Sequence, residues 1–190
     1  TAGVALYGGL SGNEDPVTFN LANRDFKADP TVLNANQDGC VVTSPQGATL
    51  TTRIDGFTIW NELLTATCGI DLSYSSPTIA NNALLGCGIS CSNSSPTIAN
   101  NTILRSGITC TYSSPLIINN TIKGSKDGGI YCGDSPAIIV NNTIIANRAS
   151  SGGGIYCYFS PATIINNIIA FNSTGLLKSG VSSTLTIRYN

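Results

Sequence analysis

The feature of this sequence that most restricts its fold is an internal repeat of five copies between Cys68 and Phe171. Each copy opens on Gly-Ile, and the second residue of an Asn pair follows ten residues after a fixed Leu or Cys position. The openings are Gly69, Gly88, Gly107, Gly129 and Gly154; the fixed positions are Leu72, Cys91, Cys110, Cys132 and Cys157; the second asparagines are Asn82, Asn101, Asn120, Asn142 and Asn167. Such a repeat predicts a stack of units, because each unit buries its apolar side only against its neighbours.

The length and periodicity of the repeat predict an all-β fold, a parallel β-helix. Consecutive copies lie 19, 19, 22 and 25 residues apart, and all the variation falls between the Asn pair and the next Gly. Apolar residues alternate with a period of two and are mostly β-branched, which is typical of strands, whereas leucine-rich repeats would show a Leu-x-x-Leu-x-Leu signature. Three short strands with turns fill one copy, so the chain should form about seven to eight coils.

Stacked coils place equivalent side chains above one another at ~4.8 Å, which predicts ladders. The asparagines should form one ladder at a tight turn, where Asn tolerates the left-handed backbone conformation. The four cysteines at the fixed position share the parity of Ile89 and should point inward as small core residues, either as free thiols or as vertical pairs. Cys68 and Cys87 form a second column, in which a disulfide is geometrically feasible.

A family resemblance agrees with these expectations. The phrase Ser-Ser-Pro-Thr-Ile-Ala-Asn-Asn, together with Gly-Ile-x-Cys, resembles the right-handed parallel β-helix repeat proteins of the pectate-lyase-like superfamily. It is most similar to the large secreted or cell-surface proteins of bacteria and archaea, and this resemblance implies an extracellular location. It does not determine function, since the superfamily includes lyases, hydrolases, adhesins and structural shafts.

We expect one solenoid domain over residues 1–190. Residues 1–60 should form irregular coils with a side loop at 11–29, residues 61–172 the five regular repeats, and residues 173–190 a partial last coil. Early strands are predicted at 4–7, 31–33, 40–42 and 48–51, and Ile54–Ile59 aligns with Ile98–Ile103. In the last coil, Gly180-Val181 is expected to replace Gly-Ile.

The composition argues against several classes of function. Charged residues make up 10% of the chain and the net charge is −1, so neither nucleic acid nor a charged membrane surface is an expected partner. No apolar run is long enough for a membrane span. The chain contains no His, which excludes Ser-His-Asp and Cys-His catalysis, and no metal or other cofactor is expected.

The candidate site residues lie on one outward strand face and in the two longest turns. Outward positions of the Gly-Ile strands are Asp71, Ser90, Thr109, Tyr131 and Tyr156, which include a single carboxylate. The charged residues of the enlarged turns are Lys123, Lys126, Asp127 and Arg148, with Asp134 nearby. A carbohydrate-binding surface is predicted from Tyr131, Tyr156 and Tyr158, with Lys126, Asp127 and Arg148 beside them. Because no set of convergent carboxylates is apparent, we expect no catalytic residue, and a polysaccharide lyase or hydrolase ranks last.

The ends of the sequence suggest a further expectation about partners. The chain opens on the apolar strand Val4–Tyr7 and closes at Tyr189-Asn190, without an evident cap. Open coils expose unpaired strand edges, which favour pairing with another chain. We therefore expect a non-catalytic extracellular structural protein that stacks head to tail into a filament. The alternatives are a surface adhesin or carbohydrate-binding module, and a fragment of a longer solenoid.

Overall fold

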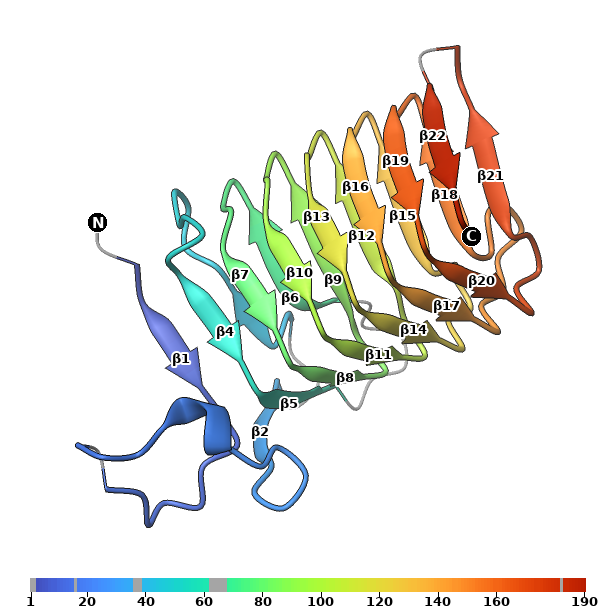
Figure 1. The fold of residues 1–190 in the computed structure, drawn as a ribbon. Helices are drawn as coiled ribbons and strands as arrows, with labels where there is room; N and C mark the ends of the chain where they lie inside the picture. The colour runs from blue at the N-terminus through green and yellow to red at the C-terminus, as the bar shows by residue number, and fades with distance from the viewer. Residues whose placement is uncertain (1–2, 16, 36–38, 62–67, 182) are drawn as a thin grey trace.

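The chain winds as a parallel β-helix. The computed structural model describes residues 3–15, 17–35, 39–61, 68–181 and 183–190. Successive turns stack along one axis, with the N-terminus at one end and the C-terminus at the other (Figure 1). Each full turn adds one strand to each of three sheets, here called A, B and C, and the strand pairs of the described residues are all parallel. Residues 62–67, which the predicted regular region includes, lie outside the described residues.

The strands are short because each spans one side of a narrow, three-sided turn. Sheet A contains β1 (Ala5–Tyr7), β4 (Arg53–Asp55), β7 (Thr78–Ala80), β10 (Thr97–Ala99), β13 (Leu116–Ile118), β16 (Ala137–Val140), β19 (Ala162–Ile165) and β22 (Leu185–Arg188). Sheet B contains β2 (Thr31–Asn34), β5 (Phe57–Trp60), β8 (Ala83–Leu85), β11 (Thr102–Leu104), β14 (Thr121–Lys123), β17 (Thr143–Ile145) and β20 (Ile168–Ala170). Sheet C contains β3 (Val42–Thr43), β6 (Cys68–Ser73), β9 (Gly88–Ser92), β12 (Ile108–Thr111), β15 (Ile130–Gly133), β18 (Ile155–Tyr158) and β21 (Leu176–Ser179).

The core lies between the three sheets and consists of apolar columns. Each column takes one inward residue per turn, and a fully buried aliphatic side chain contributes about 1.5–3 kcal/mol. Sheet C carries two such columns, and their burial confirms the inward positions predicted from the repeat. They are Ile70, Ile89, Ile108, Ile130 and Ile155, and Leu72, Cys91, Cys110, Cys132 and Cys157.

Polar ladders satisfy the backbone at two of the corners. At the corner between sheets A and B, the second residue of each Asn pair is buried. Its side-chain oxygen accepts hydrogen bonds from the residue one turn earlier, which is Phe57 for Asn82 and an Asn for the other four. Asn101, for example, donates to Asn120 Oδ1 from its backbone nitrogen (2.9 Å) and from Nδ2 (3.0 Å). A serine ladder occupies the corner between sheets C and A, where the backbone N–H of Ser113 donates to Ser135 Oγ (3.0 Å). The same pattern links Ser75, Ser94, Ser113, Ser135, Ser160 and Ser183.

The N-terminal side loop is fixed to the solenoid by one buried carboxylate. The loop includes the three-residue 3₁₀ helix η1 (Leu21–Asn23), the one helical element of the described chain, which therefore contains no helix able to cross a membrane. Arg24 reaches back to Asp55 Oδ1 (2.9 Å), while its guanidinium lies 4.8 Å from the Tyr7 ring centroid and 4.9 Å from that of Phe26. Arg53 binds the other carboxylate oxygen of Asp55. Figure 1 shows the loop at the corner where β1 ends.

Several local expectations can be compared with the strand register. The alignment of Ile54–Ile59 is confirmed, because Ile54 pairs with Ile79 and Gly56 adopts the left-handed conformation (φ 81°) in place of an Asn. The strand predicted at 48–51 is wrong: this segment forms turns, with Thr52 N–H donating to Thr49 O (2.8 Å). The placement of Gly180-Val181 is also wrong, since Leu176 pairs with Ile155 and Val181 is 96% exposed.

The two enlarged turns lie side by side at the corner between sheets B and C. Arg148 N–H donates to Ser125 O (2.7 Å) and Gly129 N–H to Gly153 O (2.9 Å), so the turn after β17 covers the turn after β14. This adjacency confirms the repeat alignment, because both insertions occupy the same place in the repeat. Two neighbouring enlarged turns therefore border sheet C on this side.

Candidate functional site

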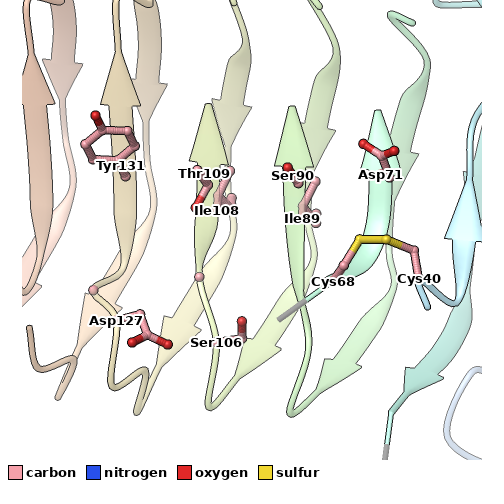
Figure 2. Close-up of a pocket in the computed structure, with 12 residues that line it drawn as sticks. Cys40, Cys68, Asp71, Ile89, Ser90, Ser106, Ile108, Thr109, Asp127 and Tyr131 are labelled. Carbon is pink, nitrogen blue, oxygen red and sulfur yellow. A yellow bond between two sulfur atoms is a disulfide. The ribbon is translucent and has the colours of Figure 1, made fainter. Parts of the chain in front are cut away.

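The outer face of sheet C carries a groove of about 400 Å³. Its floor is a row of outward side chains, one from each of four neighbouring strands: Asp71 on β6, Ser90 on β9, Thr109 on β12 and Tyr131 on β15 (Figure 2). Successive strands place these residues side by side, because Asp71 pairs with Ser90, Ser90 with Thr109, and Thr109 with Tyr131. The sequence-based expectation that this column faces outward is confirmed.

A second row forms the side of the groove nearer to sheet B. It consists of the Cys40–Cys68 disulfide, Ser106 and Asp127, which Figure 2 shows below the first row. Asp127 belongs to the enlarged turn after β14, and its backbone N–H donates to Ser125 Oγ (3.2 Å), which belongs to the same turn. The enlarged turn thus brings a second carboxylate to the groove, at the end opposite to Asp71.

The disulfide corrects the predicted pairing of Cys68. Cys68 is bonded to Cys40 in the preceding turn, with a Cα–Cα distance of 4.9 Å, whereas Cys87 is a buried free thiol. The spacing of 19 residues suggested that Cys68 and Cys87 are vertical neighbours, but a register irregularity between Cys68 and Ile70 pairs Cys68 with Gly88. A shift of one residue turns a side chain to the other face of a sheet, so Cys68 lines the groove while Cys87 enters the core.

Aromatic rings continue the groove beyond its Tyr131 end. The ring centroids of Tyr131 and Tyr156 lie 5.4 Å apart, and those of Tyr156 and Tyr158 lie 6.2 Å apart, both edge to face. Phe159 follows, 4.6 Å from Tyr158. Tyr131 and Tyr156 are half-buried, and Tyr158 is exposed. The structure therefore brings together the three tyrosines proposed from the sequence.

The hydroxyl of Tyr131 remains a proton donor over a wide pH range. Burial raises the pKa of this phenol, and the neighbouring Tyr156, Tyr158 and Asp134 raise it further, because they disfavour a phenolate. Gly133 lies under the ring, where an added Cβ would be 2.7 Å from the Tyr131 hydroxyl. The groove therefore ends at a neutral aromatic hydroxyl.

The charged candidates from the sequence do not all reach the groove. Lys126 lines a different hollow, of about 320 Å³, together with Gly86, Arg105 and Gly124. Arg148 lies in the adjoining enlarged turn and lines neither hollow. Asp134 follows β15 at the opposite corner from Asp127, so these two carboxylates do not form a common site.

Sequence reasoning placed Asp71, Ser90, Thr109 and Tyr131 in one outward column but did not predict a groove. The signal for Asp71, Ser90 and Thr109 was their parity in the repeat. The serine ladder was not predicted, although a Ser three residues after every fixed Leu or Cys would have indicated it. No sequence signal indicated that the enlarged turn directs Asp127 and Lys126 to different hollows. Nor does the described chain bring together three or more His, Cys, Asp or Glu residues as metal ligands.

Comparison with known proteins places the chain in a family. No curated protein and no solved structure matches it significantly. The family model described as the right-handed beta helix region matches residues 38–190, which include all five regular copies and the whole groove. Together with the parallel register of the three sheets, this match is decisive: the chain belongs to the right-handed β-helix family.

Proposed function

We propose that this protein is a non-catalytic extracellular solenoid that binds an extended glycan along the outer face of sheet C. The observation that carries the proposal is the groove, in which hydroxyl and carboxylate side chains from successive strands end at an aromatic strip. Sugar rings stack on aromatic side chains, and their hydroxyls bond to side chains such as Ser90 and Thr109. A row that repeats at ~4.8 Å per strand offers one position for each sugar unit of a chain lying across the strands.

The separation of the two groove carboxylates supports binding without hydrolysis. Asp71 is on β6 and Asp127 precedes β15, three strand spacings along sheet C, or ~14 Å. Glycosidases hold their two carboxylates about 5–9.5 Å apart, because both must reach one glycosidic bond. The Cys40–Cys68 disulfide supports the extracellular part of the proposal, because such bonds persist in oxidising environments.

Binding is tested by affinity electrophoresis and calorimetry against a panel of soluble polysaccharides. We expect affinity for at least one of them to fall tenfold or more in Tyr131→Ala and to be largely retained in Tyr131→Phe, which keeps the ring. Tyr112→Ala is the matched control, because Tyr112 is 67% exposed on the turn after β12 and does not line the groove. Equal losses in the Tyr131→Ala and Tyr112→Ala variants would contradict a site at the groove.

The non-catalytic part is tested on the same polysaccharides after long incubation. We expect neither new reducing ends nor the absorbance of unsaturated products. This part of the proposal would be contradicted if either product formed at a rate proportional to protein concentration and if the Asp71→Asn or Asp127→Asn variant no longer formed it.

Head-to-tail self-association is a second candidate. The inward-facing residues Leu6 of β1 and Ile187 of β22 are 53% and 50% exposed, respectively, and β1 and β22 are the outermost described strands of sheet A. A second copy that continued the sheets would cover both residues. Lys178 pairs with Cys157 at an inward position of β21, so the contact between two copies would include a charged side chain and would not be purely apolar. Sedimentation velocity tests the idea: we expect sedimentation coefficients that rise with concentration, and a monomer at all concentrations would contradict it.

A further inference from the structure

We infer that the groove prefers a glycan bearing protonated amino groups, of the polyglucosamine type, to uncharged or carboxylated glycans. This inference rests on the proposed glycan-binding function and assigns the chemical class of the ligand. It follows from the distribution of charge around the groove and from the spacing of its carboxylates.

The charged side chains among the described residues that line the groove are both acidic. They are Asp71 and Asp127, and the hydroxyl groups come from Ser90, Ser106, Thr109 and Tyr131. Asp71 Oδ1 accepts a hydrogen bond from Ser73 Oγ (2.7 Å), two residues further along β6, which restricts the orientation of this carboxylate. A carboxylate only accepts hydrogen bonds, whereas an ammonium group has three donors, so the two are complementary. A polymer of uronic acids would instead bring like charges together.

The neighbouring cations face away from the groove. Lys126 and Asp127 are consecutive in the enlarged turn, yet Lys126 lines the other hollow with Arg105. Within the described part of the chain, neither Asp71 nor Asp127 forms an ion pair. The ion pairs there join Arg24 and Arg53 to Asp55. The negative charge of the groove is therefore not neutralised by the protein itself.

The positions of the two carboxylates favour a polymer over a single sugar. They lie three strand spacings apart, ~14 Å along sheet C, with the hydroxyls of Ser90 and Thr109 between them. One amino sugar near Asp71 and another near Asp127 would be joined by sugars that cross β9 and β12. The Tyr131 side chain lines the groove at the same end as Asp127. An aromatic face also attracts an ammonium group.

The experiment compares three oligosaccharides of matched length by calorimetry: a fully deacetylated glucosamine oligomer, its N-acetylated counterpart and an oligogalacturonate. The pH is chosen so that the amino groups are protonated. We expect the deacetylated oligomer to bind at least tenfold tighter than the other two, with an affinity that falls as salt concentration rises. Asp71→Asn and Asp127→Asn should each weaken this oligomer about two- to fivefold, as is usual for exposed ion pairs, and leave the acetylated oligomer unchanged.

The matched control is Asp29→Asn, which removes the same charge from the side loop, away from the groove. Its affinity should equal that of the unmodified protein, and an equal loss would show a general charge effect and overturn the inference. Equal or tighter binding of the acetylated oligomer or of oligogalacturonate would overturn the inference and leave the glycan-binding function standing. Failure of all three oligomers and of the wider polysaccharide panel would overturn the function itself.

Discussion

The two residues of each Asn pair have different roles. The first adopts the left-handed conformation that the corner needs, as Asn119 does with φ 58°. The second is buried and forms the ladder: Asn120 Nδ2 donates to Ile98 O (2.9 Å) and to Asn142 Oδ1 (3.0 Å). One residue therefore sets the backbone conformation, and the other satisfies polar groups that the stack buries.

This division predicts opposite sensitivities within one pair. Asn120→Ala should lower the free energy of unfolding by about 3 kcal/mol, because it leaves several buried donors and acceptors without partners. Asn119→Gly should change it by less than about 1 kcal/mol, because Gly adopts the left-handed conformation freely. Urea denaturation followed by circular dichroism measures both, and similar losses would contradict the assignment.

The buried thiols should resist modification in the folded state. Burial raises the pKa of Cys87 to about 11 from an ordinary value of 9.0, and the interaction with Cys91, together with burial, raises the pKa of Cys110. Because the reagent must also reach the sulfur and all five free thiols are buried, we expect Ellman's reagent to label none of them at pH 8 until the protein is unfolded, including Cys157, whose pKa is lowered by its hydrogen bond with Cys132. For Cys87, the raised pKa also means that stability is full below pH 9 and falls as the pH rises from there towards 11. Rapid labelling of the native protein at pH 8 would show that the core opens readily.

At the scale of elements, the side loop depends on one carboxylate. Asp55 is 1% exposed and binds Arg24, Arg53 and Asn81. Burial raises the pKa of Asp55, but the hydrogen bonds from Asn81, Arg24 and Arg53 and the charge of Arg53 outweigh it, so the pKa lies below the ordinary 3.8. The loop that carries Arg24 is therefore attached to β4 by a network that needs the ionised form.

Asp55→Asn should lower the free energy of unfolding by about 3–5 kcal/mol, because it leaves the Arg24 guanidinium buried without its counter-charge. A depressed pKa gives stability that is present above the ordinary value of 3.8 and is lost as the pH falls through the lowered value. The unmodified protein should lose this contribution in that acid range, and the Asp55→Asn variant should not. Chemical denaturation at several pH values measures the difference, with Asp29→Asn as the control, and parallel pH profiles would refute the role of Asp55.

The sequence predicted the strands where the repeat is regular and failed where the register changes. The period of two and the β-branched residues identified the strands of the five copies, because alternation and burial have the same cause in a stacked sheet. The Cys68–Cys87 pairing was wrong because a local irregularity before Ile70 is invisible in residue spacing. Gly180-Val181 was misplaced because Gly180 continues the growth in copy length, whereas Gly175 requires a shorter copy, and only the pairing of Leu176 with Ile155 identifies Gly175 as the true equivalent. The groove was missed for a similar reason, since the path of an enlarged turn depends on packing against the next turn.

At the scale of the whole molecule, each turn contacts only the turn before it and the turn after it. The order of strands in all three sheets shows this arrangement, and stability in such a stack is roughly a sum of contributions from turns and their interfaces. Central turns have two neighbours, whereas the outermost described strands have one. The exposed fractions of Leu6 and Ile187 agree with this difference.

Hydrogen exchange should therefore be graded along the axis. We expect amides of β10 and β13 to exchange slowest, and amides of β1 and β22 to exchange markedly faster, because the end turns open without disturbing the centre. Native-state exchange followed by NMR or mass spectrometry measures this gradient. Uniform protection from β1 to β22 would mean that the solenoid opens as one cooperative unit.

Among the five regular copies, all variation in length is confined to the corner between sheets B and C, so residues are gained or lost there without changing the ladders or the core columns. That corner is also the rim of the groove. Mutation can thus alter the length and composition of the rim while the stack keeps its stability, which lets the groove change in evolution independently of the fold. The same independence makes the turn after β17 a natural place to graft a foreign peptide, since surface insertions at such turns are well tolerated.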